Sequence, residues 1–135
     1  GGLLSSCKSS GCSVGLKSGS VTGVTSLAGI VGKCKDEDLK SALQGQPISI
    51  AIEADQTIFQ HYTGGVITGK CGTSTDHGVL LVGYGTDAGN DYWKVKNSWG
   101  QSWGESGFVR LVQGTNQCGI NSGPNFPVFS ASVSV

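Results

Sequence analysis

Methionine is absent from the 135 residues, and charged residues make up only 13% of them. Because no Met stands at position 1, we expect Gly1 to follow a cleavage and the chain to be a processed or excised product. The formal net charge is zero, so composition provides no electrostatic attraction to nucleic acid or to an anionic membrane. No apolar window approaches the roughly 18 residues of a membrane span, and no signal-like block opens the chain. The absences favour a globular protein whose partners are neither nucleic acids nor membranes.

Glycine accounts for 23 residues, and Ser, Thr and Val are abundant, which favours short strands and turns over long helices. The length suits one domain with a core of its own. Five cysteines are present, none of them in a C-x-x-C metal pair. In this composition they indicate disulfides in a protein of the secretory pathway, located in a lysosome, a vacuole or the extracellular space. Since five is odd, one cysteine must stay unpaired or pair outside the chain.

We expect the chain to consist of two segments. Residues 1–33 are rich in Gly and Ser and resemble a crossover from another lobe, with one strand at 20–25 where apolar and polar residues alternate. Residues 34–135 carry the regular patterns of a β-rich lobe. The first of these patterns predicts a helix at 36–45, because acidic residues occupy its first turn and a glycine ends it.

A strand is predicted at 48–54, where three isoleucines share one face. The other face carries Ser49 and Ala51 and therefore accepts only small groups, as the floor of a cleft does. Further elements are expected as strands at 63–72, 79–84, 92–96, 107–112 and 126–135, helical turns at 55–62, and a loop at 121–127. The fold class is therefore α+β: a β-rich, half-open antiparallel barrel with short helices at its rim.

The stretch from Asp76 to Gly107 organises the rest of the chain. It contains His77, one of two histidines, at the start of one predicted strand, and Asn97 at the end of the next. If these strands pair antiparallel, the two side chains face each other at one end of the sheet. An imidazole held by a side-chain amide is the base of a nucleophile–base–orienter triad, and a neutral amide suits a cysteine nucleophile.

Structural roles are the alternative for each of these residues. His77 alone is more often a histidine that bonds a neighbour at the start of a strand, and Asn97 a turn residue with left-handed backbone. Trp99 is then a core aromatic. In the functional interpretation Trp99 covers the bond between His77 and Asn97 and shields it from water. The occurrence of all three together favours the functional interpretation.

Three stretches strongly resemble the C-terminal half of papain-like cysteine proteases: DHGVLLVGYGTD, YWKVKNSWGQSWGESGFVRL and CGINSGPNFPV. The resemblance is close over 34–128 and loose over 1–33. It implies the C-terminal lobe of a papain-like fold and peptide or protein substrates, with no metal and no cofactor. Propeptides and cystatin-like inhibitors are further partners that it suggests.

The resemblance also implies a role for each matching residue. His77 becomes the general base and acid, Asn97 its orienter, Asp76 an acidic neighbour that tunes it, and Trp99 its cover. Trp103 becomes a wall on the leaving-group side of the cleft. The main specificity pocket, roomy and apolar and suited to Leu or Phe, is implied at Ala51, Gly78 and Gly123.

The cysteines are assigned by the same resemblance. It implies a disulfide between Cys71 and Cys118, and a bond from Cys7 to the other lobe. Cys12 and Cys34 match no position of the family, and pairing with each other is one alternative.

A nucleophile is missing. Neither Cys7 nor Cys12 has the upstream glutamine and following aromatic residue of the family's reactive cysteine. We therefore expect the nucleophile on an N-terminal lobe or chain outside these residues, and the isolated chain to be inactive. The alternative is a non-catalytic papain-like protein, used for binding or structure, in which His77 and Asn97 are relics.

Overall fold

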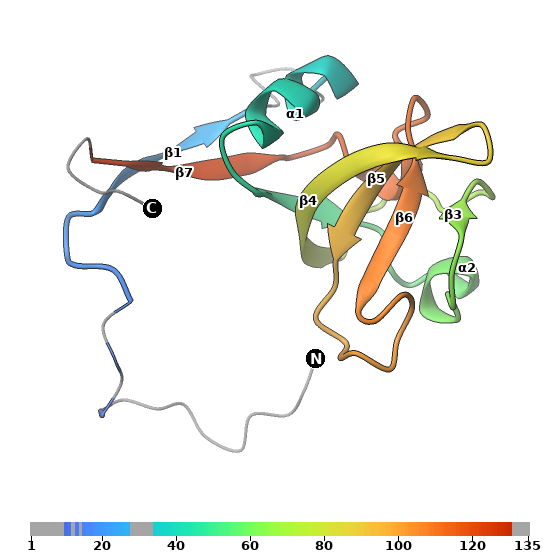
Figure 1. Cartoon of the computed structure of the whole chain (residues 1–135), viewed down its shortest axis with the longest axis horizontal. Helices are drawn as coiled ribbons and strands as arrows, with labels where there is room; N and C mark the ends of the chain where they lie inside the picture. The colour runs from blue at the N-terminus through green and yellow to red at the C-terminus, as the bar shows by residue number, and fades with distance from the viewer. Residues whose placement is uncertain (1–9, 12, 14, 28–33, 131–135) are drawn as a thin grey trace.

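The computed structural model describes residues 10–11, 13, 15–27 and 34–130. Seven strands form one sheet in the order β1-β7-β2-β4-β5-β6-β3 (Figure 1). The elements are β1 (Val21–Ser26), α1 (Asp36–Leu43), β2 (Ile48–Ile52), α2 (Thr57–Gln60), β3 (Val66–Ile67), β4 (His77–Asp87), β5 (Asn90–Lys96), β6 (Phe108–Val112), the 3-10 helix η2 (Gln117–Gly119) and β7 (Asn125–Phe129).

The expected α+β, β-rich class is confirmed, but the sheet is mixed. All neighbouring strands run antiparallel except β3, which pairs parallel with β6 through Val66 and Arg110. A parallel neighbour needs a long connection, which is supplied here by the chain from β3 through β4 and β5. The edge strands β1 and β3 do not pair with each other, so the curled sheet stays open.

The α1 helix forms where the acidic first turn predicts it. Asp38 accepts a hydrogen bond from the Lys35 backbone N–H at 3.2 Å, which caps the first turn. Leu39 is fully buried and anchors the helix, which contacts β2 and β4. The helix stops at Leu43, two residues before the expected end at Gly45.

The core lies on the side of the sheet to which Ile48, Ile50 and Ile52 point, and all three are buried. Leu81 of β4 and Trp93 of β5 complete it in the middle of the sheet. The opposite face of β2 carries the exposed Ser49 and the half-buried Ala51. The predicted alternation of large and small side chains along β2 is therefore confirmed.

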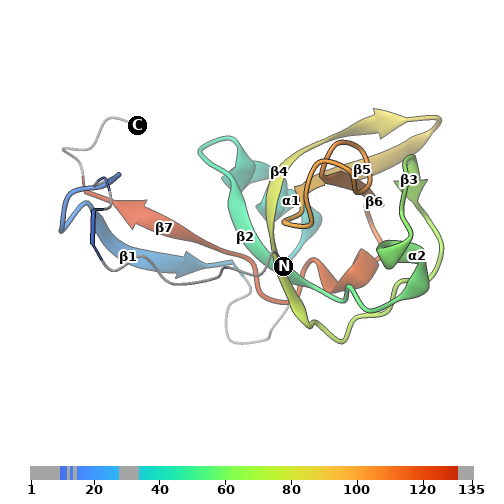
Figure 2. The same cartoon turned by 90° about the horizontal axis from the view of Figure 1, so that it is seen from below.

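The β1–β7 ribbon extends away from the rest of the sheet (Figures 1 and 2). The predicted loop at 121–127 is too long at its C-terminal end, because β7 already begins at Asn125, which pairs with Ser26 of β1 and with Ser49 of β2. The strand predicted at 126–135 is therefore present and starts one residue earlier than predicted, at Asn125. No helix in the described ranges is long and apolar enough to cross a membrane.

Candidate active site

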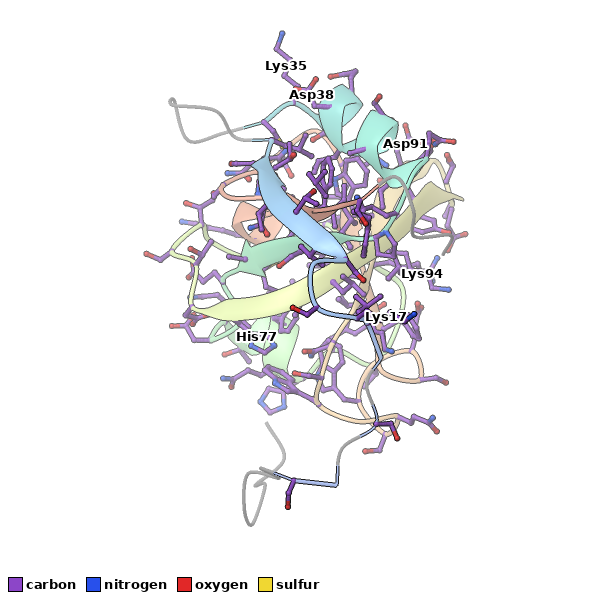
Figure 3. The ribbon with its side chains drawn as sticks, turned by 90° about the vertical axis from the view of Figure 1, so that its left-hand side faces the viewer. Lys17, Lys35, Asp38, His77, Asp91 and Lys94 are labelled. Atoms are coloured by element: carbon purple, nitrogen blue, oxygen red, sulfur yellow. A yellow bond between two sulfur atoms is a disulfide. The ribbon has the colours of Figure 1, made fainter. Side chains whose placement is uncertain are left out.

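Strands β4 and β5 bring His77 and Asn97 together. The strands pair antiparallel, with Leu80 opposite Lys96, so the start of β4 lies beside the residue that follows β5. His77 Nε2 lies 2.8 Å from Asn97 Oδ1. Since an amide oxygen can only accept, Nε2 carries the proton and donates, which leaves Nδ1 as the ring atom able to exchange a proton with another group. Figure 3 shows His77 on the side of the molecule opposite Lys35 and Asp38 at the start of α1.

Asn97 is bonded through its amide oxygen and its backbone N–H. Its side chain is buried, and its Oδ1 also accepts the N–H of Ser98 at 2.8 Å. Its own backbone N–H donates to the carbonyl of Gly107 at 2.9 Å. The amide oxygen is thus fixed toward the histidine by contacts on both sides, which is what an orienting group needs.

Trp99 covers the histidine. Its ring centroid lies 5.3 Å from that of His77, with the planes inclined by 31°. Behind it, Phe59 of α2 meets Trp99 edge-on at 5.5 Å. Burial of Phe59 therefore fixes the indole, and the indole excludes water from one side of the imidazole.

Trp103 lies in the second layer of this aromatic cluster. It contacts Trp99 edge-on at 5.2 Å and Phe59 at 5.1 Å, and its Nε1 donates to the Gln60 carbonyl at 3.1 Å. Its ring supports Trp99 and ties the loop after β5 to α2.

Asp76 is hydrogen-bonded to the end of β2 and to the chain that follows it. Its Oδ1 accepts the backbone N–H of Ala54 at 2.8 Å, and its own N–H donates to the carbonyl of Ile52 at 2.9 Å. The side chain is exposed, and these two bonds fasten the residue before His77 to the end of β2. The described contacts of Asp76 therefore hold the chain in position next to His77.

Two of the three small residues of the expected specificity pocket lie in the sheet, and the third lies in the chain before β7. Ala51 pairs with Gly78 across β2 and β4. A methyl group added at Gly78 or at Gly123 would meet no atom within 4 Å, so open space adjoins both backbones. Gly123 precedes β7 in the chain.

Two hollows adjoin this part of the sheet. One, of about 370 Å³, is lined by Ser49, Gly78, Val79, Leu80, Lys96, Asn97 and Ser98. The other, of about 210 Å³, is lined by Ala54, Asp55, Gln60, Asp76, His77 and Trp99. Asn97 therefore borders the first hollow and His77 the second, while Ala51 and Gly123 line neither.

Cys71 and Cys118 form a disulfide, with Cα atoms 4.8 Å apart. Closing a loop of this length stabilises the folded chain by about 4 kcal/mol in the chain-entropy model. Cys34 is a buried free thiol, so its pairing with Cys12 is not realised, and burial raises its pKa to about 11. Cys7 and Cys12 lie outside the described residues.

An ion-pair network that was not predicted from the sequence ties the loop between β5 and β6 to β6 itself. Arg110 of β6 pairs with Glu105 at 2.7 Å and with Asp87 at 2.6 Å. Glu105 also accepts the N–H of Gly65 at 2.9 Å, and hydrogen bonds from Arg110 hold its pKa below the usual value. Burial raises the pKa of Tyr62, whose hydroxyl donates to the Gly65 carbonyl at 2.6 Å. The stretch GESGFVR carries the opposite charges of Glu105 and Arg110 five positions apart, and this spacing was the sequence signal from which the ion pair could have been predicted.

No group of three or more His, Cys, Asp and Glu in the described part of the chain could hold a metal ion. Separately, the bond between His77 and Asn97 is an arrangement that suits proton transfer at the Nδ1 atom of His77.

Comparisons with known proteins identify the family of the chain. The family model for papain family cysteine proteases matches residues 3–128. Cysteine proteinase RD21A of Arabidopsis thaliana is 53% identical over 97 residues, which are 69% of this chain and 21% of the relative. The oryzain beta chain of Oryza sativa subsp. japonica is 50% identical over 101 residues, which are 72% of this chain and 22% of the relative. The chain thus spans about a fifth of the length of these curated relatives.

Solved structures show the same fold. The bromelain protease from Ananas comosus, in complex with the E64 inhibitor, matches at a TM-score of 0.73 and 36% identity, over 82% of this chain and 51% of that one. The Amb a 11 cysteine protease, a ragweed pollen allergen, matches in its proform at a TM-score of 0.75 and 36% identity, over 82% of this chain and 34% of that one.

Proposed function

The chain belongs to the papain family of cysteine proteases, and from this membership we propose that it supplies the base-bearing half of a cysteine endopeptidase. The observation that carries the proposal is the bond between His77 and Asn97 beneath Trp99. A histidine with one nitrogen fixed and the other free is arranged for proton transfer, whereas a structural histidine has no need of an uncommitted nitrogen.

The proposed mechanism is acyl transfer. A cysteine thiolate on the other half of the protein attacks the scissile carbonyl. Protonated His77 then delivers the proton on Nδ1 to the leaving amine, which departs, and the acyl group remains on sulfur. Neutral His77 next takes a proton from water, whose oxygen attacks the acyl carbonyl and releases the thiolate.

Asn97 orients the imidazole without adding charge. A carboxylate in its place would stabilise the imidazolium independently of the thiolate, whereas the amide leaves the thiolate as its counter-ion. Asp76, the exposed residue before His77, is proposed as the acidic neighbour of the histidine. Trp99, supported by Trp103, keeps water from the orienting bond.

Substrate selection is proposed to involve Ala51, Gly78 and Gly123. All three are small, and open space adjoins the two glycines. A pocket bounded by them accepts a large apolar side chain, such as Leu or Phe, two residues before the cut. None of these three residues is acidic, so we do not propose a preference for Arg two residues before the cut.

The second half of the site is proposed to lie on a partner lobe. The sheet face with Ser49, Gly78 and the 36%-exposed Leu80 is uncovered in the described part of the chain. A lobe covering this face would bring its cysteine to His77. We also propose that 1–33 belongs to the connection with that lobe, with Cys7 bonded to it, although β1 of this segment pairs with β7. A lysosomal, vacuolar or extracellular location would permit such disulfides.

The test compares the complete protein, bearing both halves, with the 135-residue chain. The complete protein should cleave a fluorogenic peptide with Leu or Phe two residues before the cut, and E-64 should abolish cleavage. The isolated chain and the His77→Ala complete protein should be inactive. A complete protein that folds and does not cleave would indicate a non-catalytic binding or structural role.

A further inference from the structure

Glu53 is a buried carboxylate that the proposed mechanism does not use. It follows β2 and is only 6% exposed. Both ion pairs of the described residues involve Arg110, so no cation among them neutralises Glu53. Burying an unpaired carboxylate costs several kcal/mol unless hydrogen bonds replace the lost water. The hydrogen bonds that replace this water therefore indicate the role of Glu53.

Two N–H groups converge on this carboxylate. Oε1 accepts from the Gln56 side-chain amide at 2.6 Å, and Oε2 accepts from the backbone N–H of Ser74. Hydrogen bonds to an ionised acceptor are stronger than neutral ones. A side chain that only accepts suits this pair of donors, whereas a glutamine would place its own N–H₂ against one of them.

The carboxylate also fills the turn that precedes Ser74. A methyl group built at Gly72 would clash with both carboxylate oxygens, and Gly72 has a φ of +77°. The turn is therefore shaped around Glu53. This close approach and the positive φ explain why the residue after Cys71 is a glycine.

The turn and its anchors form one clamp at the start of β4. Cys71, before the turn, is fixed by the disulfide to Cys118, and the carbonyl of Cys118 accepts the backbone N–H of Glu53 at 2.8 Å. At the other end, Asp76 is fastened to Ile52 and Ala54. Glu53 holds the middle of the segment from Gly72 to Asp76, and the next residue is His77.

From these contacts we infer that Glu53 is a positioning residue for His77. It fixes the segment 72–76, and this segment sets where the imidazole meets Asn97 and Trp99. The inference rests on the proposed function, since it assigns Glu53 a part in that reaction. Glu53 acts without contact to the substrate, and a misplacement of reacting groups by about 1 Å costs up to about a hundredfold in rate.

The test exchanges the partners across the Glu53–Gln56 contact in the complete protein. Glu53→Gln places two amides against each other, and Gln56→Glu places two carboxylates there. The double variant restores one donor and one acceptor, and leaves the amide oxygen of residue 53 to accept the Ser74 N–H. Glu37→Gln is the matched control, because Glu37 is an exposed carboxylate on α1 and not part of the segment 72–76.

We expect each single variant to lower kcat about tenfold, with KM changed less than about twofold, and to narrow the pH range over which the nucleophile is alkylated rapidly. The double variant should recover most of both, and the control should match the unaltered protein. Single variants that keep kcat and the pH range while melting at a lower temperature would overturn the inference, as would a double variant without recovery. If Glu53→Gln does not fold, Gln56→Ala, which removes one donor, should lower kcat about threefold, and an unchanged kcat would overturn it.

Failure of the proposed function has a different outcome. In that case the unaltered complete protein does not cleave peptides at all. An NMR titration of His77 still tests Glu53: a changed imidazole pKa in Glu53→Gln, absent in Glu37→Gln, supports positioning, and an unchanged pKa overturns it.

Discussion

The backbone N–H of Asn97 donates to the carbonyl of Gly107 at 2.9 Å and closes the loop 98–106 against the sheet. Both tryptophans of the site, Trp99 and Trp103, lie on this loop. The orienting amide, its cover and the support of that cover are thus held by one closed turn. Changes in the loop should therefore affect stability and catalysis together.

Gly104→Ala should destabilise the complete protein by about 2–4 kcal/mol, because Gly104 has a φ of +56° and a methyl group there would lie 2.6 Å from the Phe108 carbonyl oxygen. Gly100→Ala is the control: its φ is +91°, yet no atom lies within 4 Å of an added methyl group, so only the backbone strain of about 1–2 kcal/mol applies. Urea denaturation measures both. Equal losses would show that the close approach to Phe108 is unimportant.

Much of the fold could be predicted from local patterns. The alternation in ISIAI predicted β2, and the two strands around the His–Asn pair were predicted to lie antiparallel, as they do. Strand β4 is longer than the expected 79–84, because it pairs with β5 up to Asp87 and Asn90. The turn between them is only Ala88 and Gly89, with φ of 47° and 80°. A two-residue turn with two positive φ values is usually marked by Asn, Asp or Gly at its first position, so Ala88 gave no sign of it.

What could not be predicted depends on partners remote in sequence. The parallel contact of β3 with β6 and the pairing of β7 with β1 are set by strands elsewhere in the chain. The same holds at the site. His77, Asn97 and Trp99 lie in one motif, whereas Phe59 and Glu53 act through packing and turns that single residue types do not reveal.

Asn97→Ala should lower kcat of the complete protein by about a hundredfold, because the imidazole loses the acceptor that fixes its Nε2 proton. Steady-state kinetics with the fluorogenic peptide measures the loss. Asn90→Ala, at the β4–β5 turn, is the control and should keep full activity. An active Asn97→Ala protein would remove the orienting role from this bond.

Trp99→Leu should lower kcat/KM roughly fivefold, which corresponds to about 1 kcal/mol of lost ring contact and shielding. Trp99→Phe, which keeps an aromatic face toward His77, should lose less. Kinetics across the series separates the two contributions. Equal losses in both variants would show that ring contact with the imidazole does not matter.

Glu105→Gln should lower stability by about 1 kcal/mol at neutral pH, because the Arg110 contacts that depress the pKa of Glu105 stabilise its ionised form. A depressed pKa contributes stability above the ordinary carboxyl value of 4.5. That contribution is lost as pH falls through the lowered pKa. The difference in unfolding free energy between the two proteins should therefore vanish in acid, with Glu37→Gln as control. A difference that persists at low pH would contradict this origin.

Cys34 should resist alkylation in the folded protein. Burial raises its pKa to about 11, so the reactive thiolate is scarce near neutral pH, and the side chain is covered. Iodoacetamide at pH 8 should modify the peptide containing Cys34 only after unfolding in urea, as measured by mass spectrometry of digests that separate it from Cys7 and Cys12. Rapid labelling of the folded protein at pH 8 would show that Cys34 opens to solvent.

The raised pKa of Cys34 also affects how stability depends on pH. Its contribution to the free energy of unfolding is present below the ordinary pKa of 9.0 and is lost as pH rises toward 11. Cys34→Ala should therefore flatten the fall in stability between these pH values.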